Sequence, residues 1–422
     1  MLQLWFVANT ILWSFILNLG GLQLGLSVIV LTISGAVWLG IRRKVTVTSA
    51  TVVAALLAYL VFSLITAASG PCTDKLSKLL TTGPILMFLV LIGFEIGRKA
   101  RTSDWLDLQK TATWILLAAF SGFILEMAVP SLFPNQAAYR SEGKLSGLFM
   151  EPSGVAFSLF PCVAVLLVAE SKKIRRRGYL AVLGLLLFSR SSTLLAFIVV
   201  WVLYRLFSQR RLRQGGLLVL GMASLVILGS AINYDLLIRP TVARVVGVAA
   251  PGDTENTSSL VYLQGWQDAW ANIVRTHGLG LGFNMMGCHP LPDVPARAIL
   301  ALEGKGMEEL NAQDGSILFG KIVSEAGVGG LVFYGAIIWW WVRLEKRIRA
   351  AEDGAGRLAA STQAALIFCF VASSFIRSVG YFSGGMLLWI AAVSGALKWQ
   401  QNSALKLRVA LNSPPAKTHR DI

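Results

Sequence analysis

The sequence predicts an all-α polytopic membrane protein with about twelve transmembrane helices. Hydrophobic residues make up 55% of its 422 residues and charged residues only 14%. The mean hydropathy is +0.65, which lies outside the range of ordinary soluble domains. The apolar residues occur in runs long enough to cross ~30 Å of hydrocarbon, which takes about 20 helical residues. We therefore expect residues 1–400 to form one transmembrane domain, followed by a basic, disordered tail at 401–422.

Most of the spans can be placed directly from these runs. They lie near residues 4–19, 22–41, 47–69, 79–97, 111–129, 153–169, 216–231, 326–342, 358–373 and 384–399. No basic residue precedes the first run, and no small-residue cleavage site follows it. We therefore expect the first run to remain as a span instead of being removed as a signal peptide.

The run at 178–207 is too long for one span and is interrupted by Ser189-Arg190-Ser191-Ser192. Basic clusters at 175–177 and 210–213 flank it, and such clusters face the cytoplasm. The run should therefore enter the membrane and return, as two short helices broken at the serines. The helix formed by its first half would be only ~16 Å long, about half of the hydrocarbon thickness. Arg190 would then lie below the outer surface, in a cavity.

The distribution of charge agrees with this topology. Most of the 38 Lys and Arg residues fall on connections assigned to the cytoplasm, together with both termini. The net charge of +16 thus reflects topology and contact with anionic inner-leaflet lipid, and it gives no support to nucleic-acid binding. The sequence shows no Cys/His cluster with metal spacing and no P-loop, so we expect no metal and no other cofactor. Cys72 and Cys288 both fall outside, where they either form a disulfide or remain two separate thiols.

One outer connection, residues 233–325, is much longer than the others. Its Ser259 to Val274 part carries apolar residues at helical spacing, which predicts an amphipathic helix lying on the bilayer surface or capping the bundle. The stretch from Gly278 to Phe283 follows and is rich in glycine. It is either a place where the backbone approaches a ligand closely or a plain turn.

The outer connection at 135–153 carries Arg140 and Glu151 at the mouth of the next apolar run. An arginine and a carboxylate in such a place suit an anionic lipid headgroup better than an apolar substrate. Glu151 directly precedes Pro152-Ser153. Its carboxylate either accepts a proton from a substrate or caps the helix that follows, and the sequence leaves both open.

Several of these features occur in an order that is found in a known group of enzymes. They are Arg140 with 147–153, Ser189-Arg190-Ser191, the long outer connection with Gly278 to Gly282, and 324–330 at the start of the next span. Together with the topology, this order resembles the O-antigen polymerase and O-antigen ligase superfamily. The resemblance implies a metal-independent glycosyltransferase of the GT-C type in the bacterial inner membrane. Its substrate would be a glycan carried on undecaprenyl pyrophosphate, transferred at the periplasmic face to extend O-antigen, capsule or exopolysaccharide.

The same resemblance implies partners and roles for individual residues. The partners would be membrane lipids, a flippase and a chain-length regulator of the same pathway. Because the leaving group is a pyrophosphate, fixed arginines should stabilise it, and Arg140, Arg190 and Arg377 are the main candidates, with Arg244 in the long connection as a weaker one. Tyr381, in the outer turn between the last two spans, could stack against a sugar. The candidates for the general base are Glu151, Asp314 and Glu325, and we expect Glu325 to be structural.

Two alternative functions remain beside the polymerase. Ligases carry a His-Asn pair shortly before the span that starts near Glu325, but residues 311–316 here read Asn-Ala-Gln-Asp-Gly-Ser without a histidine. This departure favours a polymerase over an O-antigen ligase that transfers glycan to lipid A-core. A flippase or transporter of lipid-linked oligosaccharide would also need cationic residues in the membrane, but no internal repeat relates the two halves of the chain.

Overall fold

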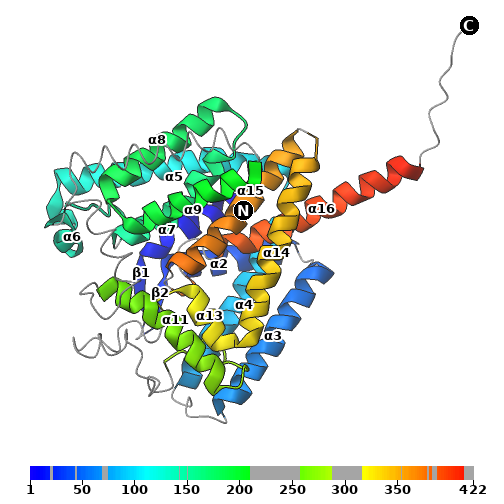
Figure 1. The fold of residues 1–422 in the computed structure, drawn as a ribbon, viewed down its shortest axis with the longest axis horizontal. Helices are drawn as coiled ribbons and strands as arrows, with labels where there is room; N and C mark the ends of the chain where they lie inside the picture. Colours follow the sequence, from blue (N-terminus) through cyan, green and yellow to red (C-terminus); the bar gives the residue numbers. More distant parts are fainter. Residues whose placement is uncertain are drawn as a thin grey trace, which may run out of the picture.

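The computed structural model describes residues 1–19, 22–42, 45–68, 75–141, 143–149, 151–209, 257–287, 316–352, 354–377, 380–382 and 387–412. This part of the chain is almost entirely helical (Figure 1). The run predicted as a span at 216–231 lies outside the described residues, as do Cys72 and Cys288.

The helices follow the apolar runs of the sequence closely. They are α1 (Leu2–Thr10), α2 (Leu26–Arg42), α3 (Val47–Ala68), α4 (Leu76–Lys99), α5 (Thr102–Ala128), α6 (Ala137–Ser141), α7 (Pro152–Leu167), α8 (Lys172–Ser189), α9 (Ser192–Gln209), α11 (Thr257–Arg275), α13 (Leu318–Ala326), α14 (Val328–Ala350), α15 (Ala355–Ile376) and α16 (Leu388–Asn412). Within the described ranges, α3, α4, α5 and α15 are long and apolar enough to cross a membrane, while α2, α7 and the first part of α9 are shorter apolar helices. The described part of the chain is therefore consistent with a helical membrane protein.

The N-terminal region departs from the prediction of a helical span at 4–19. Helix α1 has 9 residues, roughly 14 Å, which is less than half of the hydrocarbon thickness. A 3-10 turn (Leu12–Ser14) follows, and then an antiparallel hairpin of β1 (Ile16–Leu19) and β2 (Leu22–Gly25). The predicted first span is therefore wrong, although the described part of the chain as a whole is helical, as predicted. The Gly20-Gly21 pair was the signal for a hairpin in the sequence.

Helix α7 lies at the centre of the molecule. All of its residues from Pro152 to Leu167 are buried, and it packs against α1, α5, α8, α9 and α15. A helix that is apolar on every side has no solvent face to present and suits only such a position. The Pro152–Ser153 start of α7 is consequently fixed by helices on several sides, which holds Glu151 directly before it.

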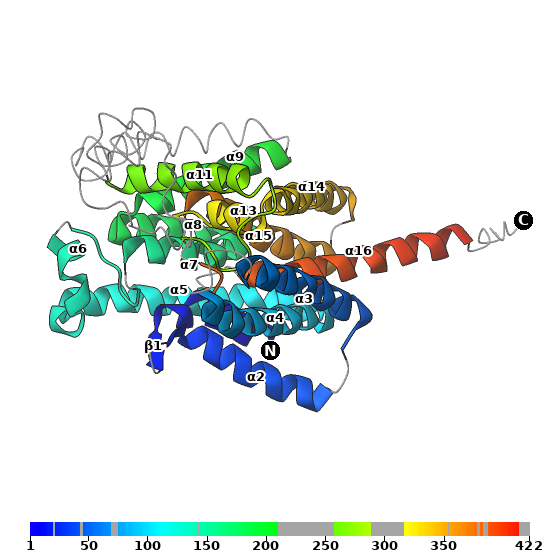
Figure 2. The same cartoon turned by 90° about the horizontal axis from the view of Figure 1, so that it is seen from below.

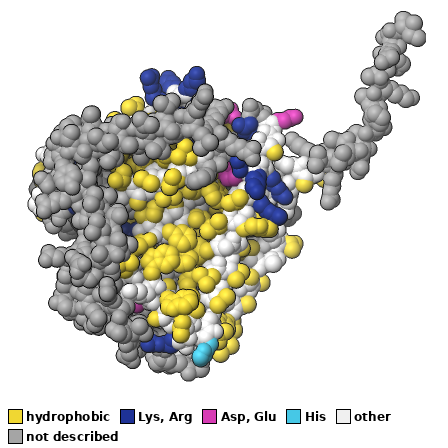
Figure 3. All heavy atoms as spheres, viewed as in Figure 1, with side chains coloured by type: hydrophobic (Ala, Val, Ile, Leu, Met, Phe, Trp, Pro, Cys, Tyr) yellow, Lys and Arg dark blue, Asp and Glu magenta, His cyan; other side chains and the backbone are white. Residues whose placement is uncertain are grey.

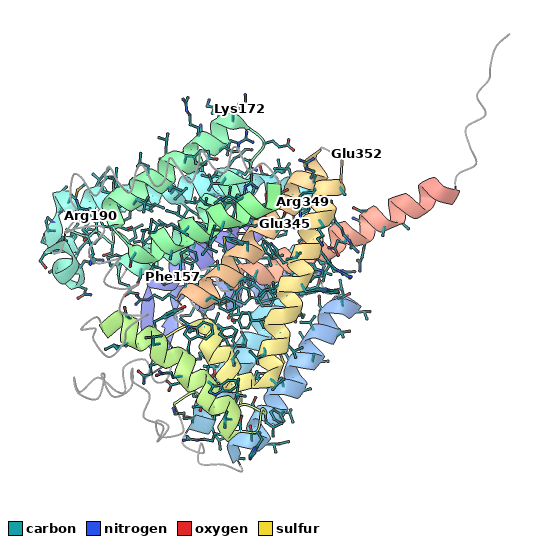
Figure 4. All side chains as sticks on the ribbon, in the orientation of Figure 1. Phe157, Lys172, Arg190, Glu345, Arg349 and Glu352 are labelled. Carbon is teal, nitrogen blue, oxygen red and sulfur yellow. The ribbon has the colours of Figure 1, made fainter. Side chains whose placement is uncertain are left out.

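The predicted break at the serines is confirmed. Helix α8 ends at Ser189, and Arg190 takes the left-handed conformation with φ 45° and ψ 37° before α9 begins at Ser192. Lys172 and Arg190 lie at opposite ends of α8 (Figure 4). However, α8 begins at Lys172 instead of 178, because the basic residues after Ser171 join the helix. Its 18 residues span roughly 27 Å, so the first half of the hairpin is longer than predicted.

The connections predicted to lie outside contact one another. The amide of Leu145 donates to the carbonyl of Phe188 at 3.0 Å, which links the segment before α7 to the α8–α9 turn. The turn after α15 bonds to residues before α7 and in α13. The amide of Phe283 donates to the hydroxyl of Ser63 at 2.9 Å, which links the glycine-rich turn to α3.

The connections predicted to lie inside form a second group. The ammonium of Lys398 donates to the carbonyl of Ala100 at 3.1 Å, and the amide of Thr46 donates to Glu95 Oε1 at 2.7 Å. In Figure 3, hydrophobic side chains cover the middle of the face, and Lys and Arg gather along its upper and upper right edges.

Two further helices complete the arrangement. Helix α11 lies on the face of the molecule opposite to α2 (Figure 2). Helix α16 continues to Asn412 and projects away from the other helices (Figures 1 and 2). Residues 401–412, which we expected to be a disordered tail, therefore extend a helix, whereas 413–422 lie outside the described residues.

Candidate functional site

An ion pair joins the turn after α15 to the start of α7. Arg377 follows the last residue of α15, and its Nη2 lies 3.1 Å from Oε1 and 3.2 Å from Oε2 of Glu151. The hydroxyl of Ser153 also donates to Glu151 Oε1. The two charged side chains are 36% and 28% exposed, so the pair is accessible from solvent. A second anion can therefore reach Arg377.

The structure decides against helix capping by Glu151. The residue occupies the N-cap position of α7, but its carboxylate accepts no capping hydrogen bond from the backbone. It binds Arg377 and Ser153 instead. Glu151 thus holds a guanidinium at the N-terminus of α7, and the prediction of a capping hydrogen bond is wrong.

Arg140 is held by Glu126, a carboxylate that is not among the predicted site residues. Its Nη1 lies 3.6 Å from Glu126 Oε1 and donates to the carbonyl of Phe133 at 2.7 Å. Glu126 is fully buried near the end of α5, and its Oε2 accepts the amides of Ser146 and Gly147 at 3.0 and 2.7 Å. Glu126 thus fixes the loop that carries Arg140. A lone carboxylate in the apolar run at 111–129 was the signal for it.

Arg190 stands at the tip of the α8–α9 hairpin, beside this loop. The bond from Leu145 to Phe188 places the two segments against each other. The side chain of Arg190 is half-buried. In the part of the chain that the structure describes, no carboxylate or carbonyl binds its guanidinium, in contrast to Arg140 and Arg377. A left-handed backbone is uncommon for any residue other than glycine, and the two helices that flank the turn hold Arg190 in it.

Glu325 lies at the centre of a buried polar cluster that we call the Glu325 cluster: Glu325, Lys321, Tyr381, Asn284 and Met286. The carboxylate of Glu325 accepts the amides of Asn284 and Met286 at 2.8 and 3.2 Å and the hydroxyl of Tyr381. The ammonium of Lys321 lies 5.4 Å from the centre of the Tyr381 ring. Glu325 is fully buried and Lys321 is 2% exposed. Donors therefore surround the Glu325 carboxylate, as expected for a structural group.

The Glu325 cluster also places Tyr381, which we expected to stack against a sugar. The ring centre of Tyr381 lies 4.9 Å from that of Phe283, in the glycine-rich turn. The ring is thus packed between Phe283 and Lys321, and its hydroxyl is bound to Glu325. In this arrangement Tyr381 joins the turn after α15 to the glycine-rich turn.

The glycines at 278–282 serve close packing of the backbone. Gly278, Gly280 and Gly282 have φ of 84°, 83° and 96°. A Cβ on Gly280 would lie 2.4 Å from the amide nitrogen of Gly327, and a Cβ on Gly327 would lie 2.0 Å from the carbonyl oxygen of Gly278. The turn therefore approaches the break between α13 and α14, which accounts for the glycines without a ligand.

The predicted helix in the long connection is confirmed as α11. It packs against α13 and reaches the C-terminal end of α15, where the hydroxyl of Tyr262 donates to the carbonyl of Phe375 at 3.0 Å. The ring of Trp266 stacks on Phe375 at 6.2 Å between centroids, and Trp270 is 68% exposed. Helix α11 thus lies against the end of α15 that presents Arg377.

One carboxylate of α11 has an unusual environment. Asp268 is 7% exposed, and no group in the described ranges donates a hydrogen bond to its Oδ1. Burial raises the pKa of Asp268 to about 6, because desolvation disfavours the charged form. Asp268 is not among the predicted site residues, since a single acidic residue on an amphipathic helix most often faces water.

The remaining predicted site residues cannot be placed. Asp314 and Arg244 lie outside the described residues. Among the residues that are described, no group of three or more His, Cys, Asp or Glu side chains could hold a metal ion. Comparisons of the chain with protein-family models, with curated proteins and with solved structures found no match.

Proposed function

We propose that the protein is a membrane glycosyltransferase that polymerises undecaprenyl-pyrophosphate-linked oligosaccharide repeat units at the periplasmic face of the bacterial inner membrane. A GT-C-like bundle of about twelve spans with both termini in the cytoplasm belongs to this proposal. The observation that carries it is the environment of Arg190. This half-buried arginine is fixed at a hairpin tip, beside the loop of Arg140, with no bound carboxylate among the described residues.

A guanidinium at the edge of an apolar bundle, with no carboxylate bound to it among the described residues, favours an anion as its ligand. Taking the charge out of water has a cost, and a bound phosphate recovers it through charge-assisted, bidentate hydrogen bonds. A pyrophosphate on a polyprenyl chain matches the arginine and the apolar helices around it. The pyrophosphate would bind the arginine, and the polyprenyl chain would contact the apolar helices. Sugar transfer adds negative charge to that pyrophosphate as it leaves. A fixed guanidinium then stabilises the transition state, typically by about 3 kcal/mol for one donor.

Arg377 is suited to a second contact with the same group. It is bound to Glu151 in the free protein and is 36% exposed. A pyrophosphate carries more charge than one carboxylate, so it can compete for the guanidinium. The Arg377–Glu151 pair would then hold the arginine in place before the substrate arrives, which lowers the cost of ordering it. Arg140 is paired with Glu126, and its loop lies beside the turn that carries Arg190.

Deletion of the gene, followed by sizing of lipid-linked and surface glycan, tests the proposal. A polymerase predicts that single repeat units reach the outer face and stay unextended. Full-length glycan stranded on undecaprenyl pyrophosphate would instead identify a ligase, and loss of repeat-unit translocation would identify a flippase. An unchanged glycan profile would exclude all of these functions.

Complementation of the deletion strain then tests the residues. Arg190→Asn should leave only single repeat units, whereas Arg176→Asn, a change at an exposed arginine of α8, should restore long chains. Asn accepts the left-handed backbone at position 190, so the loss would come from the missing guanidinium. Long glycan chains in the Arg190→Asn strain would show that Arg190 is not part of the site.

A further inference from the structure

The outward face of α14 changes from apolar to basic near the C-terminal end of the helix. Its apolar part consists of exposed side chains at helical spacing, Val328, Val332, Trp339 and Val342. Its basic part, which we call the α14 basic group, consists of exposed Arg343, Lys346 and Arg347. Figure 4 labels Arg349 and Glu352 at this end of α14, and Figure 3 shows Lys and Arg there beside hydrophobic side chains. Such a change along one face is typical of a helix that contacts hydrocarbon and ends among lipid headgroups.

Arg343 of this group lies over an exposed tryptophan. Its guanidinium carbon is 3.9 Å from the centroid of the Trp339 ring, one turn earlier on the helix. Trp339 is 57% exposed, so the pair lies on the outside of the molecule. Tryptophan prefers the border between hydrocarbon and headgroups, and a guanidinium that stacks on a ring keeps its N–H groups available for a phosphate. The pair thus marks the level of the headgroups on this face.

The acidic side chains at this end of α14 do not neutralise the group. Within the described ranges, no ion pair or hydrogen bond holds the side chain of Lys346 or Arg347. Glu345 accepts the hydroxyl of Tyr204 from α9 instead. Residues 343–357 contain five Arg or Lys residues and three Asp or Glu residues, so the segment stays positive. Like charges one helical turn apart repel each other, and a bound anion would relieve this repulsion.

The apolar part of the face favours a phospholipid over a soluble anion. From Val328 to Val342 it is ~21 Å long, which is enough for the acyl chains of one leaflet, about 15 Å thick. A phospholipid would place its acyl chains on the apolar part and its phosphate beside the basic part. In the proposed topology this end of α14 faces the cytoplasm, where the leaflet is rich in anionic lipid.

We propose that the α14 basic group and Trp339 bind the phosphate of one anionic phospholipid, whose acyl chains lie along the exposed valines of α14. The stacked guanidinium of Arg343 binds two phosphate oxygens through charge-assisted hydrogen bonds, and Lys346 and Arg347 add positive charge around them. This inference does not rest on glycan transfer. It requires only that the apolar face of α14 contacts a bilayer.

Native mass spectrometry of the purified full chain in detergent tests the proposal. The probes are phosphatidylglycerol and phosphatidylcholine with identical acyl chains. Each basic residue near a headgroup strengthens binding of an anionic lipid roughly fivefold, so the first phosphatidylglycerol should bind ~10²-fold more tightly than phosphatidylcholine. Changing Arg343, Lys346 and Arg347 together to Gln should remove this preference. Trp339→Leu, which keeps the face apolar, should weaken phosphatidylglycerol binding roughly threefold and leave phosphatidylcholine binding unchanged.

The matched control changes Lys172, Lys173 and Arg177 of α8 together to Gln. These residues are exposed as well, so the control removes the same charge from another basic surface. It should bind the first phosphatidylglycerol nearly as tightly as the unchanged protein. All of the substituted side chains are exposed, and the unfolding temperature without lipid should therefore stay the same in both triple variants.

Soluble glycerol 3-phosphate separates a lipid site from a site for free phosphate. It carries the phosphate without acyl chains, so at equal concentration it should leave phosphatidylglycerol bound. Displacement at equal concentration would assign the group to a soluble anion and overturn the proposal. Equal binding of the two lipids by the unchanged protein, or equal losses in the two triple variants, would also overturn it.

Discussion

The hydroxyl of Tyr381 donates a hydrogen bond to the buried carboxylate of Glu325, which joins the turn after α15 to α13. Four residues earlier, Arg377 pairs with Glu151 at the start of α7. Glu325 of α13 and Glu151, directly before α7, thus hold the same turn, the first through a phenol and the second through a guanidinium. The Glu325 contact is buried and the Glu151 contact is accessible, so the first serves stability and the second is available for a ligand.

Substitution of Glu325 should destabilise the protein. Glu325→Gln removes the negative charge that faces buried Lys321, and breaking one side of a buried charge pair costs about 3 kcal/mol or more. The thermal unfolding temperature in detergent, followed by tryptophan fluorescence, should fall. Glu170→Gln, at an exposed carboxylate, should leave it unchanged.

A second substitution checks the cause of that loss. Adding Lys321→Met to Glu325→Gln removes the charge left behind and should recover part of the unfolding temperature. Lys321→Met alone provides the reference. If it lowers the unfolding temperature by the same amount in the unchanged protein and in Glu325→Gln, the two side chains act independently.

Substitution of Arg377 should impair function more than stability. The Arg377–Glu151 pair is about one third exposed, and such pairs contribute roughly 0–1 kcal/mol to folding. Arg377→Gln should therefore unfold at nearly the same temperature but extend glycan ~10²-fold more slowly, because one donor to the leaving group is lost. If Arg377→Gln kept full extension of lipid-linked repeat units in nanodiscs, the arginine would have only a structural role.

Two glycines near the end of α13 provide a matched comparison. Gly327 has φ 59°, and a Cβ there would lie 2.0 Å from the carbonyl oxygen of Gly278. Gly329→Ala has open space around its new Cβ and lies in α14, where alanine is favoured. Gly327→Ala should lower the unfolding temperature by several degrees, and Gly329→Ala should keep or raise it. Equal values for the two variants would contradict the close approach of the glycine-rich turn to Gly327.

Asp268 should make stability depend on pH in a defined window. Its pKa is raised from 3.8 to about 6 in the folded state, so the folded protein binds more protons between these values than the unfolded chain. The contribution of Asp268 to the free energy of unfolding therefore falls by about 3 kcal/mol as pH rises from about 4 to about 6. Above pH 6 this contribution is constant. Asp268→Asn should remove this fall in unfolding temperature, while Asp107→Asn should retain it. A fall that persists in Asp268→Asn would assign it to another group.

The features that could be predicted from the sequence depend on local physics. Most of the described apolar runs form helices, as expected for a chain that must satisfy its backbone hydrogen bonds within each segment in hydrocarbon, and the run at 4–19 is an exception. The break at Ser189 to Ser192 and helix α11 also follow from local pattern. Basic residues are good helix formers, which is why α8 starts at Lys172, before the apolar run.

The parts of the site that were missed depend on contacts between distant segments. Glu126 receives amides that lie some twenty residues away, and Glu325 receives Asn284 and Tyr381 from two other connections. Sequence spacing carries no information on such partners. Asp268 could not be recognised either, because its burial depends on packing between α11 and α13 and not on the pattern of α11 itself.

The most direct measurement is the extension of lipid-linked repeat units by the purified full chain in nanodiscs, with the unchanged protein, Arg190→Asn and Arg176→Asn compared side by side. We predict long glycan chains from the unchanged protein and from Arg176→Asn, and unextended single repeat units from Arg190→Asn, whose unfolding temperature stays unchanged. Failure of the unchanged protein to extend the units, or long chains from Arg190→Asn, would contradict the proposed role of Arg190 in a pyrophosphate-dependent glycosyltransferase.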